Sequence, residues 1–323
     1  MKKIKILDCT LRDGGYYNNW NFTKDLINEY LKVMDVINID YVEIGFRFID
    51  KLKTKGPCAY TEENFLKKLK IPKNLKLGVM INAADFINSK NIISLAQKNF
   101  KPKKNSLISL VRIACHYNEV EDVLPLVNWL KKSGYKVGIN IMQIPELSFN
   151  NIKNVVALIK KVKVDILYFA DSLGSLDAQK TNKIIKNIRL FWKGPMGIHT
   201  HDNMGKALEN SIAATKNSVQ WIDSTVTGMG RGPGNTKTEY AILEFQSKKL
   251  NNEKLVSLLK LIKDYFDPLK EKYKWGSNPY YYFAGLHSIH PSFVQEMLAT
   301  NSFDTEDIYS NLKELNLKLR NQN

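Results

Sequence analysis

The chain has 323 residues, of which 44% are hydrophobic and 25% charged, with a formal net charge of +16. This composition excludes a disordered tail, and no apolar run approaches the ~20 residues that a membrane helix needs. The 48 basic residues include only six arginines, and the lysines are spread along the whole chain. Such diffuse charge predicts a solvated surface and no nucleic-acid partner.

Short apolar, β-rich runs recur along the chain, separated by amphipathic stretches with helical periodicity. The expected strands, in chain order, are Ile4–Leu7, Tyr41–Phe46, Leu75–Ile81, Leu107–Ala114, Lys136–Met142, Val164–Ala170, Pro195–His199 and Trp221–Val226. The expected helices between them include Thr23–Val36, Glu119–Lys132, Phe149–Lys161, Ala178–Arg189 and Met204–Lys216. This alternation predicts βαβ units and a parallel sheet.

Eight strands over about 230 residues predict an α/β fold, a (β/α)8 TIM barrel. The alternative is a doubly wound open sheet, which ordinarily carries a GxGxxG fingerprint after its first strand. Here the first turn reads Leu11-Arg12-Asp13-Gly14-Gly15, which does not match that fingerprint. The closed barrel is therefore the expected fold.

The pattern changes after Val226. A glycine-rich loop, Gly228-Met229-Gly230-Arg231-Gly232-Pro233-Gly234-Asn235, precedes an expected helix from about Thr236 to Lys248. The remainder has no convincing strand and predicts about three helices, one starting near Pro279 and another near Asp304. We expect a catalytic barrel over residues 1–250 and a helical extension packed on it over residues 251–323.

The cysteines and the N-terminus predict a cytoplasmic protein. Cys9, Cys58 and Cys115 are odd in number and lack CxxC spacing, which is typical of free thiols in a reducing compartment. The lysine-rich start is followed at once by Asp8 and the Arg12-Asp13 pair. A secretory signal is therefore not expected.

Polar residues collect at the carboxyl ends of the expected strands, where barrel enzymes carry their catalytic groups. They include four of the six arginines, which implies an anionic ligand because a guanidinium pairs bidentately with carboxylates and phosphates. The residues are Arg12, Asp13, Glu43, Arg47, Arg112, His116, Asp171, Ser172, His199, His201, Asn203, Arg231 and Asn235.

His199-Thr200-His201 is an HxH motif at a strand end. Residues i and i+2 of an extended chain point the same way, so both imidazoles can face one metal ion. With a carboxylate from Asp13 they form a mixed nitrogen and oxygen set suited to first-row divalent ions. The alternative is that both histidines only line the barrel interior.

Several segments together resemble the DRE-TIM metallolyases, a superfamily that includes HMG-CoA lyase, isopropylmalate synthase and the 4-hydroxy-2-oxovalerate aldolases. The pattern is closest to that of the aldolases. The segments are Leu7-Asp8-Cys9-Thr10-Leu11-Arg12-Asp13-Gly14-Gly15, Val42-Glu43-Ile44-Gly45, Gly197-Ile198-His199-Thr200-His201-Asp202-Asn203 and Gly232-Pro233-Gly234-Asn235.

The resemblance implies that Asp13, His199 and His201 hold a divalent metal ion, with Asn235 as a weaker fourth ligand. Mn²⁺ is the expected ion, with Mg²⁺, Co²⁺ and Zn²⁺ as alternatives. Such an ion can act as a Lewis acid on the oxygens of an α-keto acid, and Arg12 can donate to the same oxygen. Glu43 would orient Arg12 or a metal-bound water, or else form a structural ion pair at the barrel rim.

Further polar residues are expected to bind the substrate. Arg47 and Arg112 would grip a more distant carboxylate or phosphate, although Arg112 could instead brace a catalytic carboxylate. Asp171 and Arg231 complete the expected substrate-binding set.

The sequence also departs from the family pattern. The aldolases carry a histidine base shortly after the Arg-Asp pair, whereas this chain has Tyr16 and Tyr17. Tyr16 and His290 are therefore the candidate acid–base residues, with His116 and His287 as further alternatives. Because His287 and His290 are three residues apart, we expect them on one face of a helix that leans over the barrel mouth.

We expect a metal-dependent carbon–carbon lyase or aldolase that forms an enolate of pyruvate or a related α-keto acid. Its second substrate would be an aldehyde or acyl compound, and two chains would pair as a homodimer. The alternatives are a Claisen-type condensing enzyme that uses an acyl-CoA, and a non-catalytic barrel.

Overall fold

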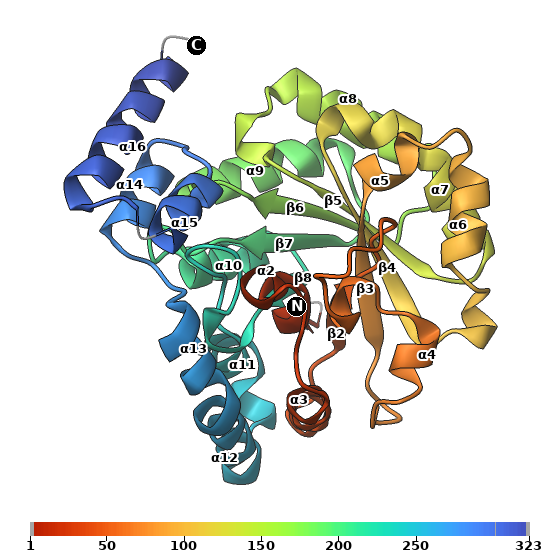
Figure 1. Ribbon diagram of the computed structural model, residues 1–323. Helices are drawn as coiled ribbons and strands as arrows, with labels where there is room; N and C mark the ends of the chain where they lie inside the picture. The colour runs from red at the N-terminus through yellow and green to blue at the C-terminus, as the bar shows by residue number, and fades with distance from the viewer. Residues whose placement is uncertain (1–2, 301, 321–323) are drawn as a thin grey trace.

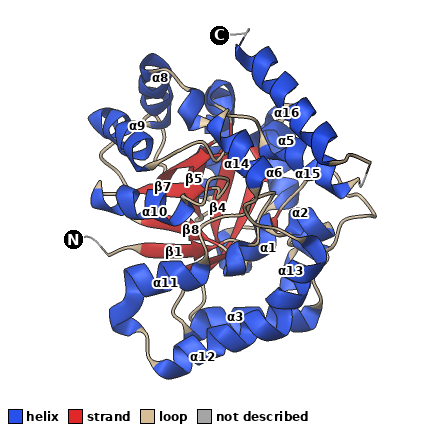
Figure 2. Ribbon diagram, turned by 90° about the vertical axis from the view of Figure 1, so that its left-hand side faces the viewer, coloured by secondary structure: helices blue, strands red, loops and turns tan. Residues whose placement is uncertain are grey.

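The expected strands close into one parallel barrel in the computed structural model, which describes residues 3–300 and 302–320. Each strand pairs with its sequence neighbours, and β8 pairs with β1, so the (β/α)8 prediction is confirmed (Figures 1 and 2). The strands are β1 (Lys5–Asp8), β2 (Tyr41–Phe46), β3 (Leu77–Asn82), β4 (Ile108–Cys115), β5 (Lys136–Ile141), β6 (Ile166–Asp171), β7 (Met196–Thr200) and β8 (Trp221–Ser224).

Helices surround the barrel, and most of them lie where the sequence predicts. Their buried faces carry the apolar residues of the helical repeat, which pack against the outer faces of the strands. They are α3 (Lys24–Val36), α4 (Glu63–Leu66), α5 (Ala83–Ile87), α6 (Ile92–Asn99), α7 (Val120–Lys132), α8 (Phe149–Ile159), α9 (Ala178–Phe191), α10 (Ala207–Lys216) and α11 (Thr238–Gln246). Of these, α4 is a single turn, so it covers little of the barrel beside it.

The barrel interior changes character along its axis. Near the amino ends of the strands it is filled by the apolar side chains of a separate cluster, which continues to Cys9 just after the end of β1. The other members are Leu7, Tyr41, Leu110, Ile166, Tyr168 and Trp221. Above this floor the inward side chains become charged, with Glu43, Arg112 and Asp223 all at most 1% exposed. Burying charges is costly unless they are paired and hydrogen-bonded, so this layer needs the mutual contacts described below.

A register shift in β2 sets the direction of the residues that follow it. Glu43 pairs with Gly78, and Phe46 pairs with Met80. Because Gly78 and Met80 are two residues apart on β3, they face the same side. Glu43 and Phe46 therefore also face one side although they are three residues apart, as a β-bulge allows. Arg47 consequently points the other way, out toward the flank of the barrel.

The C-terminal segment contains more helices than the sequence predicts. Instead of about three, the described residues form α12 (Asn252–Leu261), a π-helical turn (Ile262–Phe266), α13 (Asp267–Tyr273), α14 (Pro279–Leu286), α15 (Pro291–Ala299) and α16 (Thr305–Arg320). Prolines at the first turns of α14 and α15 help to divide what the sequence pattern reads as longer helices.

This segment packs in two different ways. Phe266 and Trp275 join the main core, whereas α14–α16 build a small cluster of their own around Tyr281, Ile289 and Leu312. In Figure 1 these last three helices stand beside the barrel at the upper left. The predicted division into residues 1–250 and 251–323, whose outermost residues lie outside the described ones, stays a prediction.

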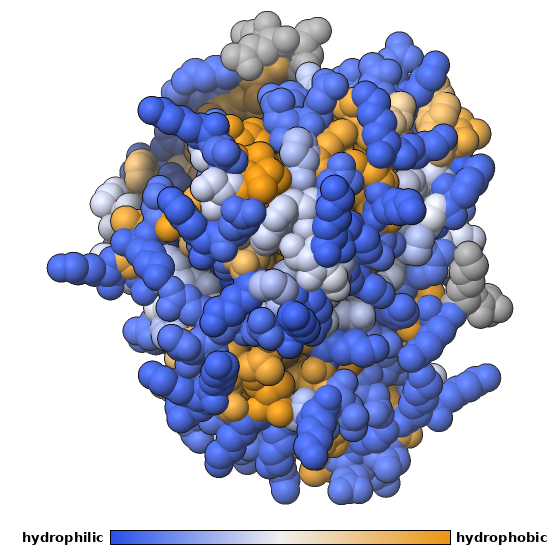
Figure 3. Space-filling model, turned by 90° about the vertical axis from the view of Figure 1, so that its right-hand side faces the viewer, coloured by the Kyte–Doolittle hydropathy of each residue, from blue (hydrophilic) through white to orange (hydrophobic). Residues whose placement is uncertain are grey.

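The surface agrees with the diffuse charge of the sequence. On the side of the barrel that carries α6 and α7, hydrophilic residues cover most of the visible face, and hydrophobic patches interrupt them (Figure 3). Within residues 3–300 and 302–320, no helix combines the length and apolar character required to cross a membrane.

Candidate active site at the barrel mouth

Arg12 and Asp13 lie in α1 (Thr10–Asp13), a single helical turn that directly follows β1. Arg12 Nε donates to Glu43 Oε2 (2.8 Å) and Arg12 Nη1 donates to Asp13 Oδ1 (2.9 Å). Trp20 Nε1 donates to the Arg12 carbonyl (2.8 Å) and so fixes the turn. Arg12 Nη2 is buried and has no partner among the described residues. This nitrogen is therefore a hydrogen-bond donor at the barrel mouth that a ligand could use.

Glu43 connects Arg12 to the charged layer beneath it. Arg112 donates to both oxygens of Glu43, from Nε (2.7 Å) and Nη2 (2.6 Å), and its Nη1 donates to Asp223 Oδ2 (2.6 Å). Burial opposes the charge of Arg112, but Asp223 and Glu43 more than offset it and raise the pKa of the guanidinium. Of the two roles left open for Arg112, the geometry favours bracing, because every nitrogen of its guanidinium donates to a carboxylate.

The two histidines of the HxH motif lie at the end of β7, with ring centroids 5.3 Å apart. His199 Nδ1 lies 2.9 Å from Asp223 Oδ2, so Asp223 sets the tautomer by accepting the Nδ1 proton. His199 Nε2 then faces Asp13 Oδ2 at 3.4 Å. The backbones of Asn235 and His201 form an isolated antiparallel β-bridge. The Asn235 side chain donates from Nδ2 to His199 Nε2 (3.0 Å).

These residues fit a divalent metal ion. Asp13 Oδ2, His201 Nδ1 and Asn235 Oδ1 are buried without a hydrogen-bond partner in the described part of the chain. Burying unpaired polar atoms is unfavourable, and carboxylate, imidazole and amide groups together match the ligands of first-row ions. A Cβ at Gly230 would lie 1.8 Å from Asn235 Oδ1 and 3.2 Å from Asp13 Oδ2. Any larger residue at position 230 would therefore fill the space between the side chains of Asn235 and Asp13.

Cys9 is close to the same cluster, which the sequence analysis did not foresee. Ligand atoms of Cys9, Asp13 and His199 all lie within 4.8 Å of one another. The thiol donates to the Ser224 carbonyl (3.5 Å), and burial raises its pKa well above the ordinary value. Without a metal ion Cys9 is therefore a neutral thiol.

The charge states follow from the same contacts. Burial opposes ionisation of Asp13, but Arg12 and His199 more than offset it and hold the pKa of this carboxyl well below its usual range. His199 is also buried, yet the nearby carboxylates of Asp13 and Asp223 raise its pKa. His201 has its pKa lowered by burial and by His199. Asp13 is thus an ionised carboxylate and His201 a neutral imidazole, the forms in which these side chains bind a metal ion.

Three further predicted residues surround the mouth. The Arg231 guanidinium lies 5.2 Å from the centre of the Tyr16 ring, and its Nε is buried without a partner among residues 3–300 and 302–320. Burial raises the pKa of Tyr16, so its hydroxyl stays protonated near neutrality. Burial and the charge of Arg231 lower the pKa of His290 to about 4. His290 is therefore a neutral imidazole beside this cation.

The extension reaches the mouth, but not through one helix face as predicted. α14 ends at Leu286, Ser288 adopts a positive φ of 55°, and α15 begins at Pro291. His287 and His290 consequently lie in the turn between α14 and α15, and His290 is the N-cap residue of α15. Gln295 accepts from the Gly232 N–H (3.1 Å), which pins the glycine-rich loop to the extension.

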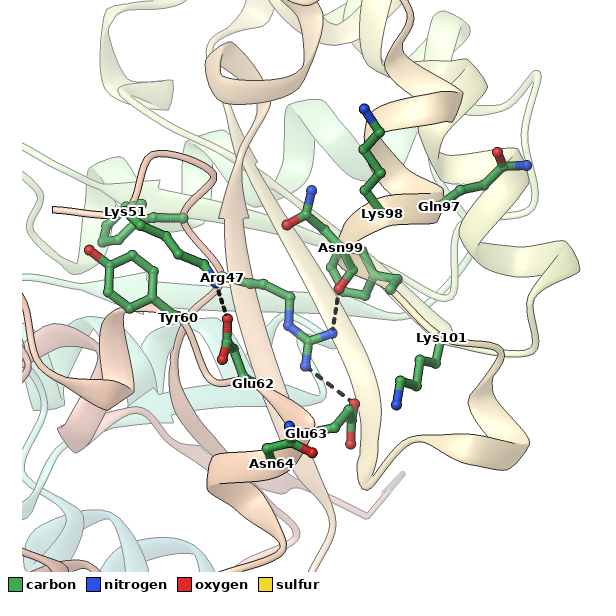
Figure 4. Close-up of a pocket in the computed structure, with 12 residues that line it drawn as sticks. Arg47, Lys51, Tyr60, Glu62, Glu63, Asn64, Gln97, Lys98, Asn99 and Lys101 are labelled. Atoms are coloured by element: carbon green, nitrogen blue, oxygen red, sulfur yellow. Dashed lines mark hydrogen bonds and ion pairs between the residues drawn. The ribbon is translucent and has the colours of Figure 1, made fainter.

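The structure does not bring Arg47 to the mouth. Its guanidinium donates to the carbonyls of Asn99 (3.1 Å) and Thr61 (2.7 Å) and pairs with Glu63 (3.4 Å) on the flank of the barrel (Figure 4). The bulge in β2 is the physical reason, because it reverses the direction of Arg47. We therefore leave Arg47 out of the substrate-binding set.

Asp171 lies at the end of β6 but is turned into the loop that follows it. Its carboxylate accepts the backbone N–H groups of Ser175 (3.0 Å) and Leu176 (3.2 Å), and the residue is fully buried. These contacts support a structural role for Asp171 rather than contact with a substrate. Asp223, in contrast, is a site residue that the sequence analysis missed, although it is the one acidic residue of its apolar strand.

A family model described as HMGL-like matches residues 108–263. Over these residues the chain is similar to the HMGL-like family. The match includes Arg112, His199, His201 and Asn235, whereas Arg12, Asp13 and Glu43 precede it. It confirms the resemblance to the DRE-TIM metallolyases, a family that depends on divalent metal ions.

Relatives extend the similarity over most of the chain. It is 29% identical to a 4-hydroxy-2-oxovalerate aldolase of Carboxydothermus hydrogenoformans, over 81% of this chain and 75% of the relative. It is 25% identical to an oxaloacetate decarboxylase of Mycobacterium tuberculosis, over 75% and 70% of the two chains. The crystal structure of the N-terminal domain of a protein from Bacteroides vulgatus matches with a TM-score of 0.79 and 29% identity, over 95% and 100% of the chains.

Proposed function

We propose that the protein is a divalent-metal-dependent carbon–carbon lyase that works through the enolate of pyruvate or a related α-keto acid. The observation that carries this proposal is the convergence of unpartnered atoms at the barrel mouth. Among the residues that the structure describes, Arg12 Nη2 lacks an acceptor, Asp13 Oδ2 and Asn235 Oδ1 lack donors, and all three atoms are buried. A donor and several Lewis bases left unpaired in one place are what an anionic substrate on a metal ion would satisfy.

Asp13, His199 and His201 would hold the ion, with Asn235 beside them, and we propose Mn²⁺ as that ion. When bound, the ion supplies Lewis acidity to the carboxylate and keto oxygens of the substrate. Arg12 Nη2 donates to the keto oxygen as negative charge grows there. Glu43 and Arg112 hold Arg12 in place, so the donor need not reorganise during the reaction.

Bond cleavage also needs a group that takes the proton of the substrate hydroxyl. As that proton leaves, the C3–C4 bond of a 4-hydroxy-2-keto acid breaks, the aldehyde departs and the electron pair passes to the C2 oxygen. We assign the proton to His290, because Tyr16 is held as a neutral phenol and serves as a hydrogen-bond donor. His290 Nδ1 lies 2.7 Å from Ser292 Oγ and accepts from the Ser292 N–H (3.3 Å). To take the proton at Nε2, the neutral ring would adopt the tautomer that carries its proton on Nδ1 and donates it to Ser292 Oγ, in place of the hydrogen bond from the Ser292 N–H.

Arg231 supports an anionic substrate. Its side chain lies at the mouth beside Tyr16, and no salt bridge pairs it with a carboxylate within the described residues. An arginine in this position can bind a carboxylate or phosphate bidentately. The partner of the keto acid would be an aldehyde, and pairing of two chains stays a prediction of the sequence.

The same enolate could arise by loss of CO2 from oxaloacetate, as the name of the decarboxylase relative suggests. In that reaction the C3–C4 bond breaks toward CO2 and no hydroxyl proton needs a base. Substitution of His290 distinguishes the two reactions, because His290→Ala should abolish aldehyde release and spare decarboxylation.

Proton exchange at the methyl group of pyruvate in deuterated water tests the proposal without the unknown electrophile. We expect exchange with Mn²⁺ present, its loss on chelation and its return when Mn²⁺ is restored. His199→Ala should abolish it, whereas Lys193→Ala, an exposed residue on the opposite end of the barrel, should not. If the metal-loaded protein catalyses no exchange, the pyruvate-enolate proposal is wrong.

A further inference from the structure

Asn140 is a buried polar residue in an otherwise apolar strand. It lies in β5, is 4% exposed, and its Oδ1 has no hydrogen-bond partner among the described residues. An amide oxygen buried without a partner costs free energy. Packing alone therefore does not explain an asparagine at this position.

The strand geometry directs Asn140 into the barrel. A Cβ built at Gly138 would lie 3.3 Å from Arg112 Cγ, so Gly138 faces the charged layer inside the barrel. Side chains two residues apart on a strand share a face. Asn140 therefore also points inward, one level nearer the mouth than Gly138.

Asn140 faces the metal cluster from across the barrel. The predicted ligands come from the segments next to β1, β7 and β8, whereas β5 lies on the opposite side of the ring. Its register partners are Ala114 on β4 and Tyr168 on β6, and the Tyr168 hydroxyl is also buried without a partner among the described residues. Ala114 and, two residues after Tyr168, Ala170 are short side chains on the same interior face. A substrate held at the metal would therefore bring its far end toward the amide.

The unpartnered atom defines the chemistry of that far end. Oδ1 is an acceptor, so it needs a group that donates a hydrogen bond, which a carboxylate, phosphate or carbonyl cannot do. A hydroxyl group both donates and accepts, and so can satisfy either side of an amide.

We propose that Asn140 is a specificity residue that binds a hydroxyl group on the carbon chain of the aldehyde substrate. The substrate class is thus a hydroxyaldehyde, which combines with the keto acid to give a polyhydroxylated product. This inference rests on the proposed function, since it assigns the second substrate of the same site.

The experiment compares aldehydes that differ by one hydroxyl. Condensation with pyruvate and Mn²⁺ is measured for glycolaldehyde against acetaldehyde and for 3-hydroxypropanal against propanal, using the wild-type protein, Asn140→Leu and Asn140→Asp. In the wild type, kcat/KM should favour the hydroxylated member of at least one pair on the order of tenfold or more. Asn140→Leu should bring that ratio close to one, while Asn140→Asp, which keeps an acceptor, should retain part of the preference.

Two controls separate this inference from the proposed function. Asn140→Leu should leave pyruvate proton exchange at the wild-type rate, because the keto acid binds on the other side of the barrel. Its urea midpoint should be unchanged or higher, because leucine removes an unpaired amide. Asn64→Leu, an exposed substitution on α4, should leave both aldehyde ratios unchanged.

Several outcomes overturn the inference while exchange remains intact. They are equal ratios in the wild type and Asn140→Leu, failure of the wild type to accept any of the four aldehydes, and a lower urea midpoint in Asn140→Leu. Equal ratios would mean that a water molecule satisfies the amide. Absence of pyruvate exchange in the wild type would instead overturn the proposed function.

Discussion

The barrel mouth and the barrel flank each bury an arginine beside a glutamate. At the mouth Arg12 donates to Glu43, and on the flank Arg47 pairs with Glu63, and both arginines are 4% exposed. The flank also has a pocket of about 420 Å³, which Lys51, Lys98 and Lys101 line together with Arg47 (Figure 4). By burial and charge alone, the flank is as plausible an anion site as the mouth.

The two regions differ in what surrounds the arginine. On the flank, two guanidinium nitrogens of Arg47 donate to backbone carbonyls, and Glu63 also accepts from Ser106 Oγ (2.5 Å) and the Leu107 N–H (3.1 Å). These contacts tie four chain segments together. At the mouth Arg12 Nη2, Asp13 Oδ2 and Asn235 Oδ1 all lack partners within the described residues, whereas on the flank only Arg47 Nε does. A buried arginine therefore indicates a ligand site where its neighbours also lack partners.

The largest expected effect tests the charged layer beneath the mouth. Arg112→Met leaves the buried carboxylates of Glu43 and Asp223 without their shared partner. Removing one member of a buried ion pair typically costs about 3–5 kcal/mol, so we expect a loss of that size in urea unfolding. Adding Glu43→Gln to Arg112→Met should recover part of it. A loss below about 1 kcal/mol would show that the layer is not coupled.

The next prediction concerns the pH dependence of stability near the mouth. Burial raises the pKa of Asp171 to about 7, compared with ~3.9 in an unfolded chain. The folded state then holds this proton more tightly, so its contribution to the free energy of unfolding is present below about pH 4 and is lost as the pH rises through 7. Relative to Asp171→Asn, the metal-free wild type should lose on the order of 2–4 kcal/mol over that range. Parallel profiles of the two proteins in urea unfolding would contradict this.

A smaller effect separates metal ligands from the residues that orient them. Asp223→Asn replaces an acceptor of the His199 Nδ1 proton and removes a charge opposite Arg112. Loss of such an orienting carboxylate typically weakens metal binding by about 10–100-fold, which calorimetry with Mn²⁺ can measure. Asp177→Asn, at the exposed N-cap of α9, is the control and should bind Mn²⁺ as the wild type does. Unchanged affinity in Asp223→Asn would remove Asp223 from the site.

The smallest effect is expected on the flank. Arg47→Met removes hydrogen bonds to Thr61 and Asn99 and should lower the free energy of unfolding by about 1–2 kcal/mol. Because the flank is structural, pyruvate exchange should stay within about threefold of the wild type. A larger loss of exchange in a folded Arg47→Met protein would make the flank part of the site.

Local patterns in the sequence predict the barrel well. Each predicted strand overlaps an observed one, since apolar runs of strand length alternate with helical repeats along the chain. The Arg12-Asp13 pair lies just after β1, and the HxH motif lies at the end of β7. Their place at the barrel mouth therefore follows from where these two strands end in the sequence. Short-range spacing therefore carries the central part of the candidate site.

Features that depend on register or on distant partners could not be predicted in the same way. A single bulge in β2 sends Arg47 to the flank, and no local pattern marks it. Arg112 is a brace because Glu43 and Asp223 meet it from other strands. His290 reaches the mouth through a turn rather than a helix face, because Pro291 begins a new helix.

The most direct test of the account is pyruvate methyl-proton exchange in Arg12→Lys and Arg47→Lys, measured side by side with Mn²⁺ present. Lysine keeps the charge in each case but loses the fixed arrangement of donors. We predict that Arg12→Lys lowers the exchange rate on the order of 10²–10³-fold, while Arg47→Lys stays close to the wild type. Equal effects of the two substitutions, or a larger loss in Arg47→Lys, would contradict the assignment of the chemistry to the barrel mouth.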